Sequence, residues 1–234
     1  MKEDNIVIGI EGLVGSGKTS ICRELLKRDE KFVLLNGGNL YRAIVYTVMQ
    51  KESNLFKLKK ILKSADIKQY MDDLNVEIKI EDRESKIYIN GKIVDEEELQ
   101  SKASSLAVSI IGGIADNTKL FEFSRNLIEE LKNGYNVIVS GRALMEIYPN
   151  LDYHLFITAS LDERVKRKCI QYKEENSKFS VKRNIKIRDK LQKIAGFYKI
   201  FPNTIQIDVT ECKTVEESTN KVLENIKLEI KGEV

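Results

Sequence analysis

The segment from residue 12 to residue 19 carries the clearest chemical pattern in the chain, since it reads Gly12-Leu-Val-Gly15-Ser-Gly17-Lys18-Thr19. This is the complete pattern G-x-x-x-x-G-K-[ST], in which glycines let successive backbone N–H groups turn towards phosphate oxygens. The lysine of the pattern reaches the β- and γ-phosphates of a nucleotide, and the next hydroxyl reaches Mg²⁺. The segment therefore predicts a nucleoside triphosphate site.

The residues on either side of this segment support that prediction. Asn5–Ile10 is a β-branched apolar run typical of a buried strand, and residues 19–27 are typical of a helix. A helix that begins at such a loop directs the positive end of its dipole at the phosphates. We expect ATP and Mg²⁺ as cofactors, with Thr19 at the metal and with nucleotide contacts from Gly12, Gly15, Ser16, Gly17, Lys18, Thr19 and Ser20.

The rest of the chain alternates between strand and helix patterns. Continuous apolar runs predict strands at 32–35, 135–139, 153–158 and 205–209, while helical patterns follow near 40–51, 54–72, from 162 and at 215–230. Alternation of this kind predicts an α/β fold, with a parallel sheet flanked by helices.

One segment departs from the alternation of strands and helices. Residues 76–94 alternate apolar and charged side chains, and the Asn90-Gly91 step is typical of a hairpin turn. We therefore expect a small antiparallel meander inside an inserted α+β lobe at about 54–116. The whole chain, 1–234, is then one domain.

Composition narrows the class of protein. The chain has 234 residues, 42% of them hydrophobic, and a formal net charge of only +3, which excludes a disordered chain and does not favour a nucleic-acid partner. No apolar run approaches the roughly 20 residues that span a membrane. Three cysteines lie far apart, as expected of free thiols in a reducing cytoplasm, where we expect the protein to act as a monomer.

Several segments resemble those of bacterial cytidylate (CMP) kinases. The resemblance opens with Ile8-Gly-Ile-Glu11-Gly-Leu-Val-Gly-Ser-Gly-Lys-Thr19 and the following Leu35-Asn-Gly-Gly-Asn-Leu-Tyr41-Arg42-Ala43. It continues in the same order through 90–94, 139–142, 149–152, 156–164 and 185–189. The resemblance implies a P-loop nucleoside monophosphate kinase that transfers a phosphoryl group from ATP to CMP or dCMP, a small-molecule nucleotide. It also implies that the inserted lobe binds the monophosphate and that residues at about 162–190 form a lid over the site.

The resemblance also assigns roles to individual residues. It implies that Lys18, Arg142, Arg164 and Arg188 neutralise charge on the transferring phosphoryl group. It implies acceptor contacts from Asn36, Gly37, Tyr41, Arg42, Arg142 and Arg188. Glu11 matches an acidic position of the family, so it is expected at the metal with Thr19; a hydrogen-bonding role behind the metal is the alternative.

The acceptor site departs from the family pattern. The family reads Asp-Gly-Arg-Asp where this chain has Ser140-Gly-Arg-Ala143, and Gln192 and Asn36 also stand at acidic positions. These departures leave two alternatives open. The alternatives to a CMP or dCMP kinase are a P-loop kinase of another small-molecule acceptor and a nucleotide-binding regulator without catalysis.

Overall fold

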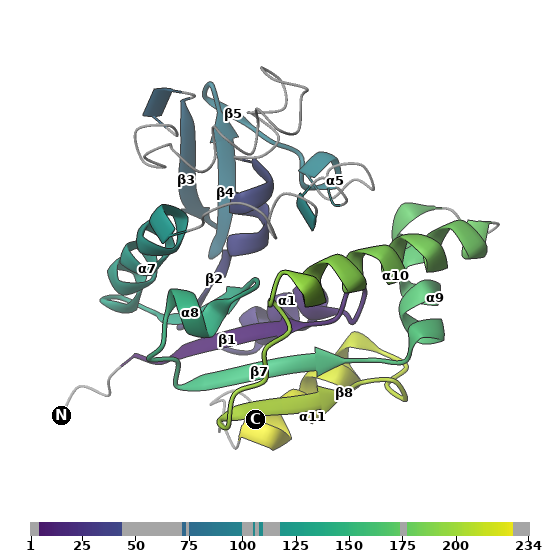
Figure 1. Ribbon diagram of the computed structural model, residues 1–234. Helices are drawn as coiled ribbons and strands as arrows, with labels where there is room; N and C mark the ends of the chain where they lie inside the picture. Colours follow the sequence, from purple (N-terminus) through teal and green to yellow (C-terminus); the bar gives the residue numbers. More distant parts are fainter. Residues whose placement is uncertain are drawn as a thin grey trace.

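The computed structural model describes residues 5–43, 72–73, 75–99, 105, 108–109, 118–173 and 177–226. Within these residues, eight strands form one sheet (Figure 1). Its parallel centre has the strand order β2 (Phe32–Asn36), β6 (Asn136–Ser140), β1 (Val7–Gly12), β7 (Tyr153–Thr158) and β8 (Thr204–Asp208). The predicted α/β fold with a parallel sheet is confirmed.

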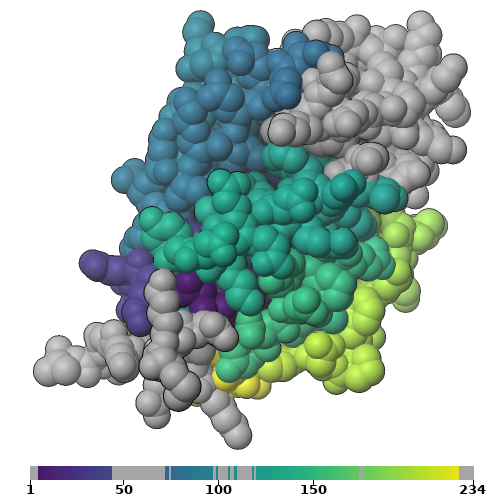
Figure 2. Space-filling view, turned by 90° about the vertical axis from the view of Figure 1, so that its left-hand side faces the viewer, coloured from purple at the N-terminus to yellow at the C-terminus, as the bar shows by residue number. Residues whose placement is uncertain are grey.

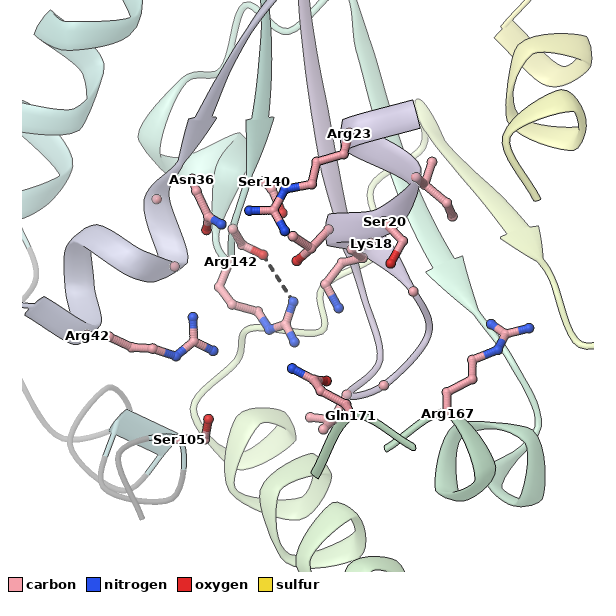
Figure 3. A pocket seen from close by; sticks show the side chains of 18 of the residues that line it. Lys18, Ser20, Arg23, Asn36, Arg42, Ser105, Ser140, Arg142, Arg167 and Gln171 are labelled. Atoms are coloured by element: carbon pink, nitrogen blue, oxygen red, sulfur yellow. Dashed lines mark hydrogen bonds between the residues drawn. The ribbon is translucent and has the colours of Figure 1, made fainter. Parts of the chain in front are cut away.

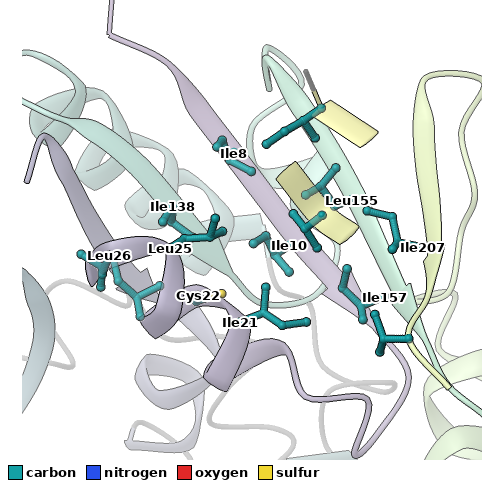
Figure 4. Packing of buried hydrophobic residues seen from close by; sticks show 14 of the residues in the cluster. Ile8, Ile10, Ile21, Cys22, Leu25, Leu26, Ile138, Leu155, Ile157 and Ile207 are labelled. Atoms are coloured by element: carbon teal, nitrogen blue, oxygen red, sulfur yellow. The ribbon is translucent and has the colours of Figure 1, made fainter. Parts of the chain in front are cut away.

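The central strands form because their side chains are apolar towards both faces of the sheet. On one face, Ile8 and Ile10 of β1 pack with Ile21 and Leu25 of helix α1 (Lys18–Arg28), as Figure 4 shows. On the other face, Val7 joins a second cluster under helices α7 (Thr118–Lys132) and α8 (Leu144–Ile147). Helices on both faces leave the carboxyl ends of the parallel strands as the edge where a ligand can bind.

The predicted meander is present as β3 (Val76–Glu81), β4 (Glu84–Ile89) and β5 (Lys92–Ile93), which pair antiparallel. The turn between β4 and β5 has left-handed backbone at Asn90 and Gly91, with φ of 51° and 72°. Strand β4 also pairs in parallel with β2, through Leu34 and Glu84, so the meander extends the main sheet. Figure 2 shows this meander in blue above the teal surface that begins at α7.

The remaining helices are α5 (Glu96–Leu99), α9 (Leu161–Tyr172), α10 (Lys178–Ile194) and α11 (Val215–Ile226), and residues 37–43 are also helical. Three predicted helices lie partly or mostly outside the described residues. The undescribed parts are 44–51 of the helix at 40–51, 54–71 of the helix at 54–72 and 227–230 of the helix at 215–230. The proposed bounds of the lobe and the lid stay predictions. Among the described helices, none is both long and apolar enough to cross a membrane.

Gly12, where β1 turns into the loop, is the position at which a side chain is least tolerated. Its φ is 146°, and a Cβ there would lie 2.0 Å from the carbonyl oxygen of Ile157 in β7. We predict that Gly12→Ala lowers the free energy of unfolding by about 3 kcal/mol or more, measured by urea denaturation. Gly134→Ala is the control, because no described atom lies within 4 Å of a Cβ at that site. Equal midpoints for the two variants would contradict the argument.

Candidate active site

A cavity of about 970 Å³ opens at the carboxyl ends of β1, β2 and β6. The phosphate loop forms one wall, and the described residues of the inserted segment, α9 and α10 form the others. Figure 3 shows Lys18, Arg42 and Arg142 directed into this hollow from separate elements. Cationic side chains from five different parts of the sequence line it: Lys18, Arg42, Arg142, Lys168 and Arg188. A cavity lined in this way suits an anionic ligand.

The phosphate loop has the geometry that its glycines predict. Gly15 and Gly17 have φ of 80° and 99°, and α1 begins directly afterwards at Lys18. The Lys18 ammonium donates to the carbonyl oxygens of Gly12 (2.9 Å) and Leu13 (2.8 Å). Burial, and then the charges of Arg142, Lys168 and Arg188, hold the pKa of Lys18 well below its usual value. Bound phosphates would relieve this repulsion by supplying the opposite charge.

The other predicted nucleotide contacts are also at the loop. Gly15, Gly17, Thr19 and Ser20 line the cavity, whereas Ser16 is fully buried and its hydroxyl has no hydrogen-bond partner among the described residues. Mg²⁺ usually keeps several waters and binds through substrate phosphates, so it needs few protein ligands. The hydroxyl-bearing Thr19 at the cavity wall fits such an ion.

The predicted acceptor contacts lie where β2 ends and the next helix begins. Asn36, Gly37, Tyr41 and Arg42 all line the cavity. The hydroxyl of Tyr41 and the Nε of Arg42 are buried without a hydrogen-bond partner among the described residues. Burial, followed by the charges of Arg188 and Arg142, lowers the pKa of Arg42 to about 10. Such uncompensated donors are ready to bind an acceptor oxygen.

Two further arginines complete this wall. Arg142 donates from Nε to Gln192 Oε1 (2.8 Å), and Arg188 donates from Nη1 to the Tyr172 hydroxyl (3.4 Å). These partners are neutral, and no ion pair within the described part of the chain engages either guanidinium. The positive charge of Arg142 and Arg188 thus stays available for a phosphate.

Arg164 has a different environment from the one that the resemblance implies. It is 6% exposed and donates to the carbonyl oxygens of Ala159 (3.0 Å) and Val14 (3.1 Å) and to Asp189 Oδ2 (2.6 Å). Asp189 Oδ1 in turn accepts from the Val14 N–H and from the Tyr198 hydroxyl. The pair therefore ties α9 and α10 to the phosphate loop. Arg164 is not on the cavity wall, and its catalytic assignment stays a prediction.

Glu11 is directed at the α8 side of the sheet. It is 2% exposed, and its carboxylate accepts from the Leu144 N–H and lies 3.5 Å from His154 Nε2. It does not line the cavity, which favours the hydrogen-bonding alternative over contact with the metal. Among the described residues, no group of three His, Cys, Asp or Glu side chains is placed to hold a metal ion by itself. Metal binding by Glu11 stays a prediction.

Several wall residues were not singled out from the sequence. Ser105, Ser109 and Ser124 line the cavity, and no sequence motif marks them. Lys168 belongs to the basic run Arg164-Val-Lys-Arg-Lys168, and nothing in that run distinguishes it from the other cations. Gln192 stood out as a departure from the family pattern, but its hydrogen bond to Arg142 needs the tertiary structure.

The fold and this site together define a P-loop nucleotide-binding α/β protein. The family model for cytidylate kinase matches residues 8–228, so the chain belongs to the cytidylate kinase family. It is 28% identical to the cytidylate kinase of Caldicellulosiruptor bescii, over 100% of both chains. It is 27% identical to that of Fusobacterium nucleatum subsp. nucleatum, over 96% of this chain and 98% of the relative. It is 28% identical to that of Bacillus licheniformis, over 95% and 96% respectively.

The Arg164–Asp189 pair generates a stability prediction. Arg164→Leu leaves the Asp189 carboxylate without its cation, so we predict a loss of about 3–5 kcal/mol in the free energy of unfolding. The measurement is urea denaturation. Lys182→Leu removes the exposed ion pair with Asp162 on the same two helices and should leave the midpoint unchanged. A wild-type midpoint for Arg164→Leu would show that the pair contributes nothing.

Proposed function

We propose that this protein transfers the γ-phosphoryl group of ATP to the phosphate of CMP or dCMP. The observation that carries the proposal is the cavity itself, in which the phosphate loop faces Arg42, Arg142 and Arg188. Membership of the cytidylate kinase family supports the choice of substrates. The volume of about 970 Å³ lies at the upper end of the range for small-molecule sites, as expected of a site for two substrates.

The proposed mechanism relies on positioning and on neutralising charge, because phosphoryl transfer needs little covalent chemistry from the protein. The loop N–H groups and Lys18 hold the phosphates of ATP. Arg42, Arg142 and Arg188 hold the monophosphate of the acceptor and direct one of its oxygens at the γ-phosphorus. Thr19 would help to hold Mg²⁺, and such an ion would supply further positive charge for the phosphates. Closure of α9 and α10 would exclude water, so that hydrolysis does not compete.

A second candidate is a kinase with a different small-molecule acceptor. Within the described residues of the wall, the carboxylates are Glu96 and Glu163, and each is bonded to an arginine, Arg23 and Arg167 respectively. The base and sugar of an acceptor would therefore meet serine hydroxyls and the amide of Gln192 rather than free carboxylates. This polar but uncharged lining favours no single base as strongly as a carboxylate would.

The choice of acceptor is tested by ADP formation from Mg-ATP in a coupled assay against CMP, dCMP, UMP, dTMP, AMP and GMP. We predict turnover with CMP and dCMP, because Arg42, Arg142 and Arg188 line the cavity opposite the phosphate loop and could together hold a monophosphate. If no acceptor on the panel gives ADP while ATP still binds, the substrate assignment is wrong and the second candidate takes its place.

The role of the phosphate loop is tested by Lys18→Ala. We predict that ADP formation falls by about 10³-fold or more, because the cation nearest the transferring phosphoryl group is lost. Lys27→Ala is the matched control, since this lysine lies on the same helix and its side chain is 73% exposed. Circular dichroism should show that both variants remain folded. A near-normal rate for Lys18→Ala would contradict the assignment of the loop.

A further inference from the structure

Lys168 of α9 lies against the phosphate loop and lines the cavity. Its Cγ would be 3.1 Å from a Cβ at Gly15, so the lysine stem packs directly on the loop glycine. Its Nζ donates to Gln171 Oε1 (2.6 Å) and lies 5.1 Å from the centre of the Tyr172 ring. Neither partner carries a negative charge. Among the described residues, the lysine is thus held at the cavity wall by neutral partners rather than by a carboxylate.

The groups that face Lys168 from the packed elements are cations. They are Lys18 of α1, Arg42 of the helical segment 37–43 and Arg188 of α10. Among the described acids of α9 and α10, Glu163 is bonded to Arg167 and Asp189 to Arg164. Burial first, and then the charges of Arg188 and Arg42, lower the pKa of Lys168 to about 7. An arginine at this position would stay charged, whereas a lysine can release its proton.

We propose that Lys168 binds the nucleotide phosphates and takes up a proton from solvent as they enter the cavity. The inference rests on the proposed function only in that it takes a nucleotide to be the ligand. The step is –NH₂ plus H⁺ giving –NH₃⁺ beside a phosphate oxygen, so no covalent bond of the nucleotide forms or breaks. Before the phosphates bind, the neutral amine of Lys168 adds no repulsion to the neighbouring cations. After they bind, its ammonium form supplies a positive charge that the phosphates offset.

The direction of the pH effect follows from linkage. Phosphates raise the pKa of Lys168 because they favour its charged form. Below about pH 7 the lysine already carries its proton, so binding takes up little from solvent. Above pH 7 the proton must come from solvent, and the affinity falls as the pH rises, by up to about tenfold per pH unit. The second ionisation of a phosphate monoester, near pH 6, lies below this window.

The test measures proton uptake directly. ATP is titrated into the full chain at pH 8.0 by isothermal calorimetry in two buffers of different ionisation enthalpy, Tris and HEPES. We expect the wild type to take up about 0.5 to 1 proton more per ATP than Lys168→Arg, which keeps a cation that does not titrate. Lys18 also has a lowered pKa, and the charge of Lys168 is one of the causes. Because an arginine at position 168 stays charged, Lys18 should take up at least as many protons in Lys168→Arg as in the wild type, so an excess in the wild type is assigned to Lys168.

Two further variants complete the experiment. Lys168→Met should bind ATP about tenfold or more weakly at pH 6.5, where the wild-type lysine is charged. Lys186→Met, which removes an exposed lysine of α10, should match the wild type in affinity and proton uptake. Equal uptake by the wild type and Lys168→Arg overturns the inference, as does the absence of ATP binding. If uptake differs but CMP and dCMP give no ADP, the proposed function fails while the inference stands.

Discussion

The concentration of like charge in one cavity is the constraint on which the rest of this structure depends. Lys18, Arg42, Lys168 and Arg188 converge from four separate segments, and burial and mutual repulsion lower the pKa of each. A site like this is costly to assemble without its ligand, because charges in a poorly solvated space interact strongly. The fold must therefore hold these side chains by contacts made elsewhere.

Those contacts are ion pairs beside the converging cations. The Arg164–Asp189 pair joins α9 and α10, the helices that carry Lys168 and Arg188, to the backbone of Val14. On the opposite wall, Arg23 of α1 binds Glu84 of β4 (2.7 Å) and thereby ties the inserted meander to the helix that follows the phosphate loop. Ion pairs thus serve as supports, whereas Lys18, Arg142, Lys168 and Arg188 donate to neutral groups within the described residues.

Much of the fold could be predicted because it depends on local signals. Apolar runs locate the central strands within a residue or two, and the Asn90-Gly91 step locates the hairpin turn. The pairing of β4 with β2 could not be predicted, because Leu34 and Glu84 are distant in sequence and no local pattern records their contact. The sequence likewise left open where the Glu11 carboxylate points. Its place at the α8 side depends on Leu144 and His154, which follow more than a hundred residues later.

The sequence by itself determined the nucleotide site, since the loop glycines, Lys18 and Thr19 form one continuous segment whose backbone does most of the binding. It also predicted Arg42, Arg142 and Arg188 as acceptor contacts, through a family resemblance carried by short segments. Only the tertiary structure decided which cations share the cavity. Lys168 lies on the cavity wall, whereas Arg164 forms an ion pair with Asp189. Yet Arg164 and Lys168 lie one helical turn apart in the same basic run. Residues four apart share one face of a helix, so the different environments of Arg164 and Lys168 come from the distant segments that pack against each of them. A local sequence pattern does not record such long-range contacts.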